Sequence, residues 1–244
     1  MLLYYEKLVD TNFMDLFDAI KKRRSIRKYT EKMVPPEVIR NALELALLAP
    51  NSSNGQTWNF FWVKSADKKP QLIKACLNQS AARTAAELIV VVASPEAWER
   101  SHKELVCFIE AVKAPKSVVF YYQKLFPSMY RWGFLNSIGL LKRLIFFVTG
   151  IFRPIMRGPG TLRDIQEVCI KSAALAAENF VLAITAQGYA TCMMEGFDEP
   201  RVKKLLGLKY SDRVVMVISV GEEAERGTWG PRFRISSDKV IHEV

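Results

Sequence analysis

Residues 164–187, DIQEVCIKSAALAAENFVLAITAQ, form the longest helical pattern in the chain. One side of the expected helix carries apolar or small residues at helical spacing, namely Ile165, Val168, Cys169, Ser172, Leu175, Ala176, Asn179, Leu182 and Ala183. Gly188 suits the position just after the helix, where a left-handed backbone is common. Because small side chains allow close approach, we expect this helix to lie in the core or at a subunit interface.

The segments around this helix alternate between strand and helix patterns. Strand patterns cover 58–64, 88–93, 189–194 and 213–220, and helix patterns cover 13–23, 36–49, 70–77, 96–112, 164–187 and 200–206. Asn12 is the expected N-cap of the first helix, and Pro50 is expected to end the second. Residues 88–93 are continuously apolar, which is typical of a central strand covered on both faces. Without a regular βαβ period, the pattern predicts a layered α+β fold.

The composition is that of a globular protein with a single domain over 1–244. Half of the 244 residues are hydrophobic and 25% are charged. Residues 1–12 are expected to form an N-terminal arm. The four cysteines are Cys76, Cys107, Cys169 and Cys192. They lie in apolar runs without a C-x-x-C pair, so we expect buried free thiols and no metal site. Without a signal-peptide pattern, such thiols indicate a cytoplasmic protein.

The net charge of +10 is unevenly distributed. Between Glu110 and Asp164 there is no acidic residue. The basic residues of this stretch are Lys113, Lys116, Lys124, Arg131, Lys142, Arg143, Arg153, Arg157 and Arg163. Such an excess can face nucleic acid, anionic lipid or an acidic substrate. We expect no nucleic-acid partner, because the basic residues are mixed with apolar ones and no nucleic-acid-binding motif is present.

An arginine-rich segment follows the first expected helix, Arg23-Arg24-Ser25-Ile26-Arg27-Lys28-Tyr29. Guanidinium groups give paired, charge-assisted hydrogen bonds to phosphate oxygens, so this segment is a candidate phosphate clamp. Cations at the end of a helix are also favoured by the helix dipole alone, which leaves a structural role open. Arg232 and Arg234 alternate as on a strand and can complete the same phosphate site.

Two further segments are suited to a planar heterocycle. Residues 49–58, APNSSNGQTW, offer amides that both donate and accept hydrogen bonds, although an ordinary capped turn has a similar composition. Residues 194–197, MEGF, follow a strand pattern. Gly196 there would allow a backbone N–H to approach a planar ligand without a Cβ in the way.

Taken together, these segments resemble the FMN-dependent nitroreductase family over about 13–63 and from 164 to the C-terminus. The resemblance implies that the FMN phosphate is held by Arg23, Arg24, Ser25, Arg27, Arg232 and Arg234. It implies that the ring or ribityl chain is touched by Ser53, Asn54 and Gln56. It also implies that Met194, Glu195 and Gly196 lie along the flavin, with the Gly196 N–H donating to N5. Thr57 departs from the family pattern, in which proline usually precedes the tryptophan.

The resemblance also carries expectations about fold and reaction. It implies a central, mostly antiparallel sheet flanked by helices, in an interlocked homodimer with FMN at the interface. The helix 164–187 would form the dimer core, and 235–244 would cross to the partner. The flavin would take a hydride from NAD(P)H and reduce a small nitroaromatic or quinone-like acceptor by a ping-pong mechanism, without a catalytic side chain. Dehalogenation, dehydrogenation and flavin breakdown are alternative reactions for the same fold.

Residues 113–163 are the part that the resemblance explains least. Within 126–156, aromatic and basic residues surround LIFFVTGIF at 144–152, a run too short to span a bilayer. The first interpretation is an insertion that covers the active site as a lid. A basic helix resting on anionic lipid and plain core packing are the alternatives. For the whole chain, the rival class is a non-enzymatic protein that binds nucleic acid or membrane.

Overall fold

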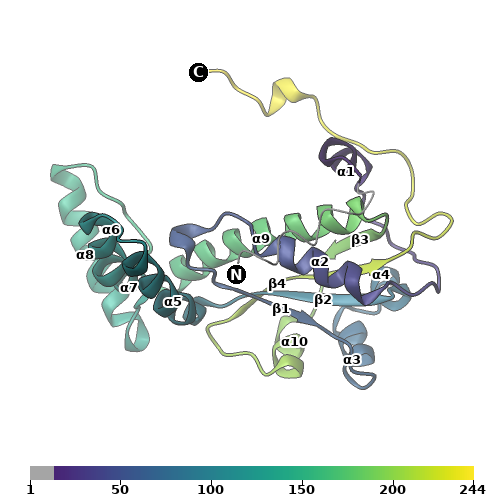
Figure 1. Ribbon diagram of the computed structural model, residues 1–244, viewed down its shortest axis with the longest axis horizontal. Coiled ribbons are helices and arrows are strands. Elements are labelled where there is room, and N and C mark those ends of the chain that lie inside the picture. The colour runs from purple at the N-terminus through teal and green to yellow at the C-terminus, as the bar shows by residue number, and fades with distance from the viewer. Residues whose placement is uncertain (1–13) are drawn as a thin grey trace.

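The computed structural model describes residues 14–244 and has a four-stranded sheet at its centre (Figure 1). The strands are β1 (Trp58–Trp62), β2 (Glu87–Ala93), β3 (Ala190–Met194) and β4 (Arg213–Gly221). Their order in the sheet is β1-β2-β4-β3, and each neighbouring pair is antiparallel. The predicted α+β class and antiparallel sheet are confirmed.

Strand β2 is the buried centre of the molecule, as its apolar run predicts. Residues 88–93 are all fully buried. Because successive side chains point to opposite faces of a sheet, Ile89 and Val91 pack into one core cluster, whereas Val90 and Val92 pack into the other. Helices therefore cover both faces. On the second face these are α3 (Lys68–Ala75), α4 (Ser80–Thr84) and α10 (Glu199–Leu206).

The first face is covered by α9 (Leu162–Ala186) and α2 (Pro36–Ala46), which pack along each other. The small side chains of α9 serve this packing within the chain, since Ala173, Ala176 and Ala177 are fully buried. The predicted buried side was only partly correct. Leu175 is 48% exposed, whereas Phe180 is fully buried although the pattern left it out. Helix α9 is covered by the sheet and by α2, so its buried arc is wider than one stripe.

Both ends of α9 are closed by capping motifs. At the start, the Thr161 hydroxyl accepts a hydrogen bond from the Asp164 N–H, and the Asp164 carboxylate accepts one from the Thr161 N–H at 2.9 Å. At the end, Gly188 has a φ of +86° and confirms the prediction for this position. The Tyr189 N–H donates to the Ile184 carbonyl at 3.1 Å, which completes a Schellman motif.

Replacing Asp164 with asparagine is expected to destabilise the fold by about 1 kcal/mol at neutral pH. Burial opposes ionisation of Asp164, but N–H groups of residues 160 and 161 and the Arg143 guanidinium lower its pKa to about 2. A carboxyl with a lowered pKa stabilises the fold above its unfolded pKa, near 4, and this stabilisation is lost as the pH falls through 2. Urea unfolding should therefore separate the wild type from D164N at pH 7 and bring them together near pH 2.

The control for this prediction is Asp67→Asn. Asp67 also precedes a helix, but its side chain accepts no capping hydrogen bond. This substitution should leave the free energy of unfolding nearly unchanged at pH 7, where D164N is expected to be destabilised. Equal destabilisation by both substitutions would show that the capping box is not the cause.

The helix boundaries correct two predictions. Helix α1 (Leu16–Lys22) is capped by Asp15, whose carboxylate accepts from the Phe17 N–H at 2.7 Å. The predicted cap Asn12 and the predicted arm 1–12 lie outside the described residues. Helix α2 ends at Ala46, before Pro50, because Leu47 begins a tighter turn in which its N–H is shared among several carbonyls.

Residues 95–152 form a helical lobe at the left-hand end of the molecule in Figure 1. Its elements are η3 (Pro95–Ala97), α5 (Trp98–Ala111), α6 (Lys116–Phe120), η4 (Tyr121–Leu125), α7 (Phe126–Tyr130), η5 (Phe134–Asn136) and α8 (Ser137–Phe152). Cys107 on α5 is exposed, so the prediction of a buried thiol is wrong there and correct for the other three. Helix α5 turns one side to solvent, and Cys107 lies on that side.

The C-terminal segment 222–244 contains one short helix, η6 (Ser237–Lys239), and forms no strand in the sheet of this chain. The strand expected at Arg232 and Arg234 is therefore not formed there. The start of the segment is held by backbone hydrogen bonds, with the Ala224 N–H donating to the Lys28 carbonyl at 3.1 Å. The remainder runs past α1, as the yellow trace in Figure 1 shows.

Candidate functional site

The arginine-rich segment lies at the β3 edge of the sheet. Ser25 pairs with Thr191 of β3 in a parallel bridge, and the Ile26 N–H donates to the Thr191 carbonyl at 2.9 Å. On its other side, the Arg27 N–H donates to the Gly227 carbonyl at 2.7 Å. The segment is thus held between β3 and the start of the C-terminal segment, which brings together residues about 200 positions apart.

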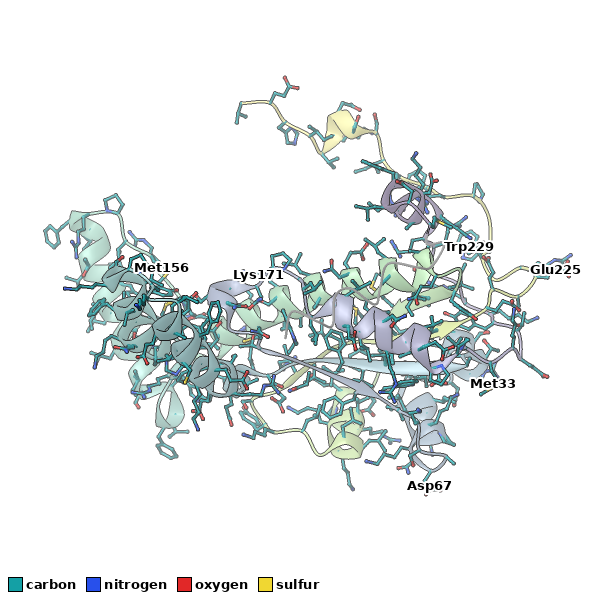
Figure 2. All side chains as sticks on the ribbon, in the orientation of Figure 1. Met33, Asp67, Met156, Lys171, Glu225 and Trp229 are labelled. Carbon is teal, nitrogen blue, oxygen red and sulfur yellow. The ribbon has the colours of Figure 1, made fainter. Side chains whose placement is uncertain are left out.

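A cavity of about 470 Å³ opens where these segments meet. Its lining consists of Arg23, Arg24, Ser25, Arg27, Thr228, Trp229, Gly230, Pro231, Arg232, Phe233 and Arg234. All six residues predicted to hold a phosphate are in this set. Figure 2 labels Trp229 near α1, at the end of the molecule away from the helical lobe. We call this space the arginine cavity.

The arginine cavity carries a strong excess of positive charge. Of its five guanidinium groups, only that of Arg23 has a carboxylate within ion-pair distance in the described chain, Glu178 at 3.8 Å. Two others tie the walls together: Arg24 donates to the Gly230 carbonyl at 3.0 Å, and Arg232 donates to the Arg23 carbonyl. Guanidiniums held by neutral carbonyls keep their full charge. The cavity therefore favours a multiply charged anion such as a phosphate.

Cys192 is a buried residue of β3, and its thiol lies close to Ser25, which lines the cavity. Burial raises the pKa of its thiol, and the nearby Arg27 and Arg23 charges only partly oppose this. The thiol is therefore neutral near pH 7 and unsuited to act as a nucleophile. The chemistry of the site must come from another group.

The other end of β3 presents the second group of predicted residues. Met194 is buried at the end of the strand, and Glu195 and Gly196 are exposed after it. At about 3.3 Å per strand residue, Met194 lies about 10 Å from Thr191, so this end continues from the arginine cavity along one sheet edge. Both groups can thus touch one elongated ligand.

Gly196 is held from the side by Gln79, a residue that the sequence did not indicate. The Gln79 side-chain amide donates to the Gly196 carbonyl at 2.6 Å, while the Gly196 N–H has no acceptor in the described part of the chain. Gln79 directly precedes α4, and 117 positions separate it from Gly196. No local pattern could have identified it, because only the packing of α4 beside β3 brings the two together.

The third predicted group, the loop with Ser53, Asn54 and Gln56, has an unusual backbone. These three residues have φ values of +54°, +49° and +45°, which non-glycine residues rarely adopt. The Gln56 N–H donates to the Asn51 side-chain oxygen at 2.8 Å, and this bond helps to hold the conformation. Strained backbone of this kind is concentrated at functional sites.

This loop does not reach the arginine cavity of its own chain. The Ser53 hydroxyl lies 2.6 Å from the Tyr121 hydroxyl, so the loop contacts the helical lobe. The arginine segment follows α1, and Figure 1 shows α1 and the lobe at opposite ends of the molecule. The predicted site residues are therefore in two places: one along β3 and one beside the lobe.

The fold and the arginine cavity define an α+β protein with a strongly cationic cavity at the edge of its sheet. The chain belongs to the Nitroreductase family, which it matches over residues 20–222, including the segment 113–163. A Streptococcus pyogenes serotype M6 protein, named as an NAD(P)H nitroreductase, is 26% identical over 93% of this chain and 98% of its own. A Thermus thermophilus protein named NADH dehydrogenase is also 26% identical, over 93% of this chain and 95% of its own.

The fold is also that of solved proteins. A structure from Exiguobacterium sibiricum 255-15, determined in complex with FMN, has a TM-score of 0.69 and 19% identity, covering 96% of this chain and 99% of its own. At this identity the likeness establishes the fold alone. Family membership and the names of the relatives place the chain among oxidoreductases.

Proposed function

We propose that the protein is a homodimeric, cytoplasmic oxidoreductase that binds FMN and uses NAD(P)H to reduce a small nitroaromatic or quinone-like acceptor. The observation that supports FMN most directly is the arginine cavity, where five guanidiniums meet beside the β3 edge. A phosphate dianion is the part of FMN that fits this charge. The solved structure of a protein with the same fold contains FMN, and this supports the proposal.

The residues along β3 fit the rest of the cofactor. The Gly196 N–H has no acceptor among the described residues, and Gln79 fixes the backbone there, so a planar ring can lie against it with a defined hydrogen bond. When bound, FMN would supply hydride chemistry between NAD(P)H and the acceptor in one shared pocket, which implies ping-pong kinetics. The protein contributes phosphate binding, ring orientation and the donor at Gly196.

A dimer explains why the site residues of one chain lie in two places. We propose that Ser53, Asn54 and Gln56 of one protomer complete the FMN site that the partner builds around its own arginine cavity. The strained backbone of these residues would then serve to direct their polar groups toward the partner's FMN. Tyr121 supports the loop through the Ser53 hydroxyl. The lobe that contains Tyr121 would then cover the composite site as a lid.

The decisive experiment is the anaerobic visible spectrum of the purified protein before and after addition of NADPH and NADH. We expect a yellow protein whose flavin absorbance bleaches with at least one nucleotide and returns when a quinone or nitroaromatic is added. A colourless protein that cannot be reconstituted with FMN would overturn the proposal. A yellow protein that neither nucleotide bleaches would keep the cofactor and refute NAD(P)H as the donor.

A further inference from the structure

Helix α8 presents an uncovered apolar face to solvent. Nine of its residues are between 42% and 81% exposed: Ile138, Leu140, Leu141, Leu144, Ile145, Phe147, Val148, Ile151 and Phe152. At 100° per residue, they fall on one half of the helix surface, and no charged residue lies among them. Phe134 and Leu135 just before the helix are also at least 80% exposed. A continuous patch of this kind marks an interaction surface.

The other half of α8 is fixed to the protein, which sets the direction of the apolar face. Gly139 packs so closely that a Cβ there would lie 2.7 Å from the Gly160 carbonyl oxygen. Arg143 pairs with Asp164 at 2.9 Å, and the Lys142 ammonium donates to the Arg131 carbonyl at 2.5 Å. The two cations of the helix thus have partners on the inner side, and the outward half carries apolar residues and Ser137 but no charge.

The stretch of chain that carries this face is free of acidic residues, and the carboxylate that contacts α8, that of Asp164, is paired with Arg143 on the inner side. Residues 111–163 contain no acidic side chain, and eight of their nine lysines and arginines are exposed. In the described chain, only Arg143 among these eight forms an ion pair. Arg153, which follows α8 directly, is exposed at the end of the apolar face. The Arg157 guanidinium, also exposed, donates to the Gly150 carbonyl at 2.9 Å near the same end. An apolar stripe with exposed cations at its end is the pattern of a helix that lies on an anionic membrane.

We propose that α8 docks the protein on the surface of anionic phospholipid bilayers. The continuous helix has 16 residues, about 24 Å, which is shorter than the roughly 30 Å hydrocarbon layer. The Arg143–Asp164 ion pair on its inner side would also have to enter hydrocarbon if the helix crossed. The helix therefore lies in the interface, with its apolar half in the acyl boundary and the basic residues at the headgroups.

Charge favours a lipid surface over a second copy of this face. In a two-fold contact between two α8 faces, two acid-free and strongly basic segments would lie side by side, which is repulsive. Cover over the arginine cavity of the same chain is excluded by position. Figure 2 shows Met156, just after α8, and Trp229, which lines the cavity, at opposite ends of the molecule.

The test is cosedimentation of the purified holoprotein with vesicles of phosphatidylcholine, with or without phosphatidylglycerol. We expect binding to the anionic vesicles only, and release by added salt. The double variant L144Q/F147Q should bind at least about a hundredfold more weakly, since two apolar side chains no longer enter the lipid. Arg153→Gln should weaken binding about fivefold.

The matched control is M33Q/L77Q. Met33 and Leu77 are 76% and 66% exposed, and Met33 lies far from the lobe in Figure 2. This variant should bind vesicles like the wild type. Absent binding to anionic vesicles, equal binding to neutral ones, or an unchanged affinity of L144Q/F147Q would each overturn the proposal.

Two further outcomes would overturn lipid docking and show what covers the apolar face of α8 instead. A smaller mass of L144Q/F147Q in lipid-free sedimentation would assign it to a second copy. A changed KM for the acceptor without vesicle binding would assign it to a lid. Flavin content and bleaching by NAD(P)H are measured without lipid, so failure of docking and failure of the proposed redox function remain distinguishable.

Discussion

Replacing both Arg23 and Arg232 with alanine is expected to weaken FMN binding by at least about a hundredfold. Each arginine offers charge-assisted hydrogen bonds, worth about 1.5–3 kcal/mol apiece, and the two lie on opposite walls of the arginine cavity. The Arg23 side chain is 20% exposed and pairs with Glu178, and Arg232 ties the cavity walls together, so the melting temperature of the variant is measured alongside to separate loss of the clamp from loss of the fold. Flavin content after gel filtration and the dissociation constant from fluorescence titration measure the effect.

The matched control for this prediction removes two arginines outside the cavity. Arg40 on α2 and Arg163 on α9 are both exposed and form no ion pair within the described chain. The variant R40A/R163A carries the same change in net charge, so it separates local clamping from the general field of the protein. If flavin retention is unchanged in R23A/R232A, or falls equally in both variants, the arginine cavity is not the phosphate site.

Replacing Gly196 with valine is expected to reduce the rate of flavin bleaching by NAD(P)H on the order of a hundredfold. Gly196 is exposed at the end of β3, where the ring is proposed to lie, and a bulky side chain would hold the ring away from the backbone N–H. Displacement of reacting groups by about 1 Å can cost this much in rate. Stopped-flow bleaching measures the rate, and Gly196→Ala should give an intermediate value.

A second variant separates a ligand effect from a packing effect. Among residues 14–244, the Cβ of residue 196 would meet only the Gln79 side-chain amide, at 3.3 Å. In the double variant Q79A/G196V, this contact is removed. The slow bleaching should persist if valine acts on the ligand. Recovery of the wild-type rate in the double variant would show that the defect arose from the displaced Gln79 side chain, and the proposed contact would be wrong.

Local sequence patterns predicted most of the elements and the six residues that come together in the arginine cavity, but not that Ser53, Asn54 and Gln56 lie apart from it. The apolar run at 88–93 and the position of Gly188 depend on near neighbours, so their structures follow from the local chain. The arginine cavity was predicted as a residue set because its chemistry is encoded in residue types. Its shape was not, since the segment with Arg232 is held by the bond from Arg232 to the Arg23 carbonyl and the bond from Arg24 to the Gly230 carbonyl rather than by a strand.

The sequence by itself determined the α+β class, the residues suited to a phosphate and the acid-free apolar segment. These properties follow from periodicity and charge, which need no knowledge of distant contacts. Only the tertiary structure decided that Gln79 fixes Gly196, that Ser53 faces the lobe, and that α8 turns its apolar half outward. Each of these depends on contacts between segments far apart in the chain, and such contacts are set by how whole layers pack, not by local residue preference.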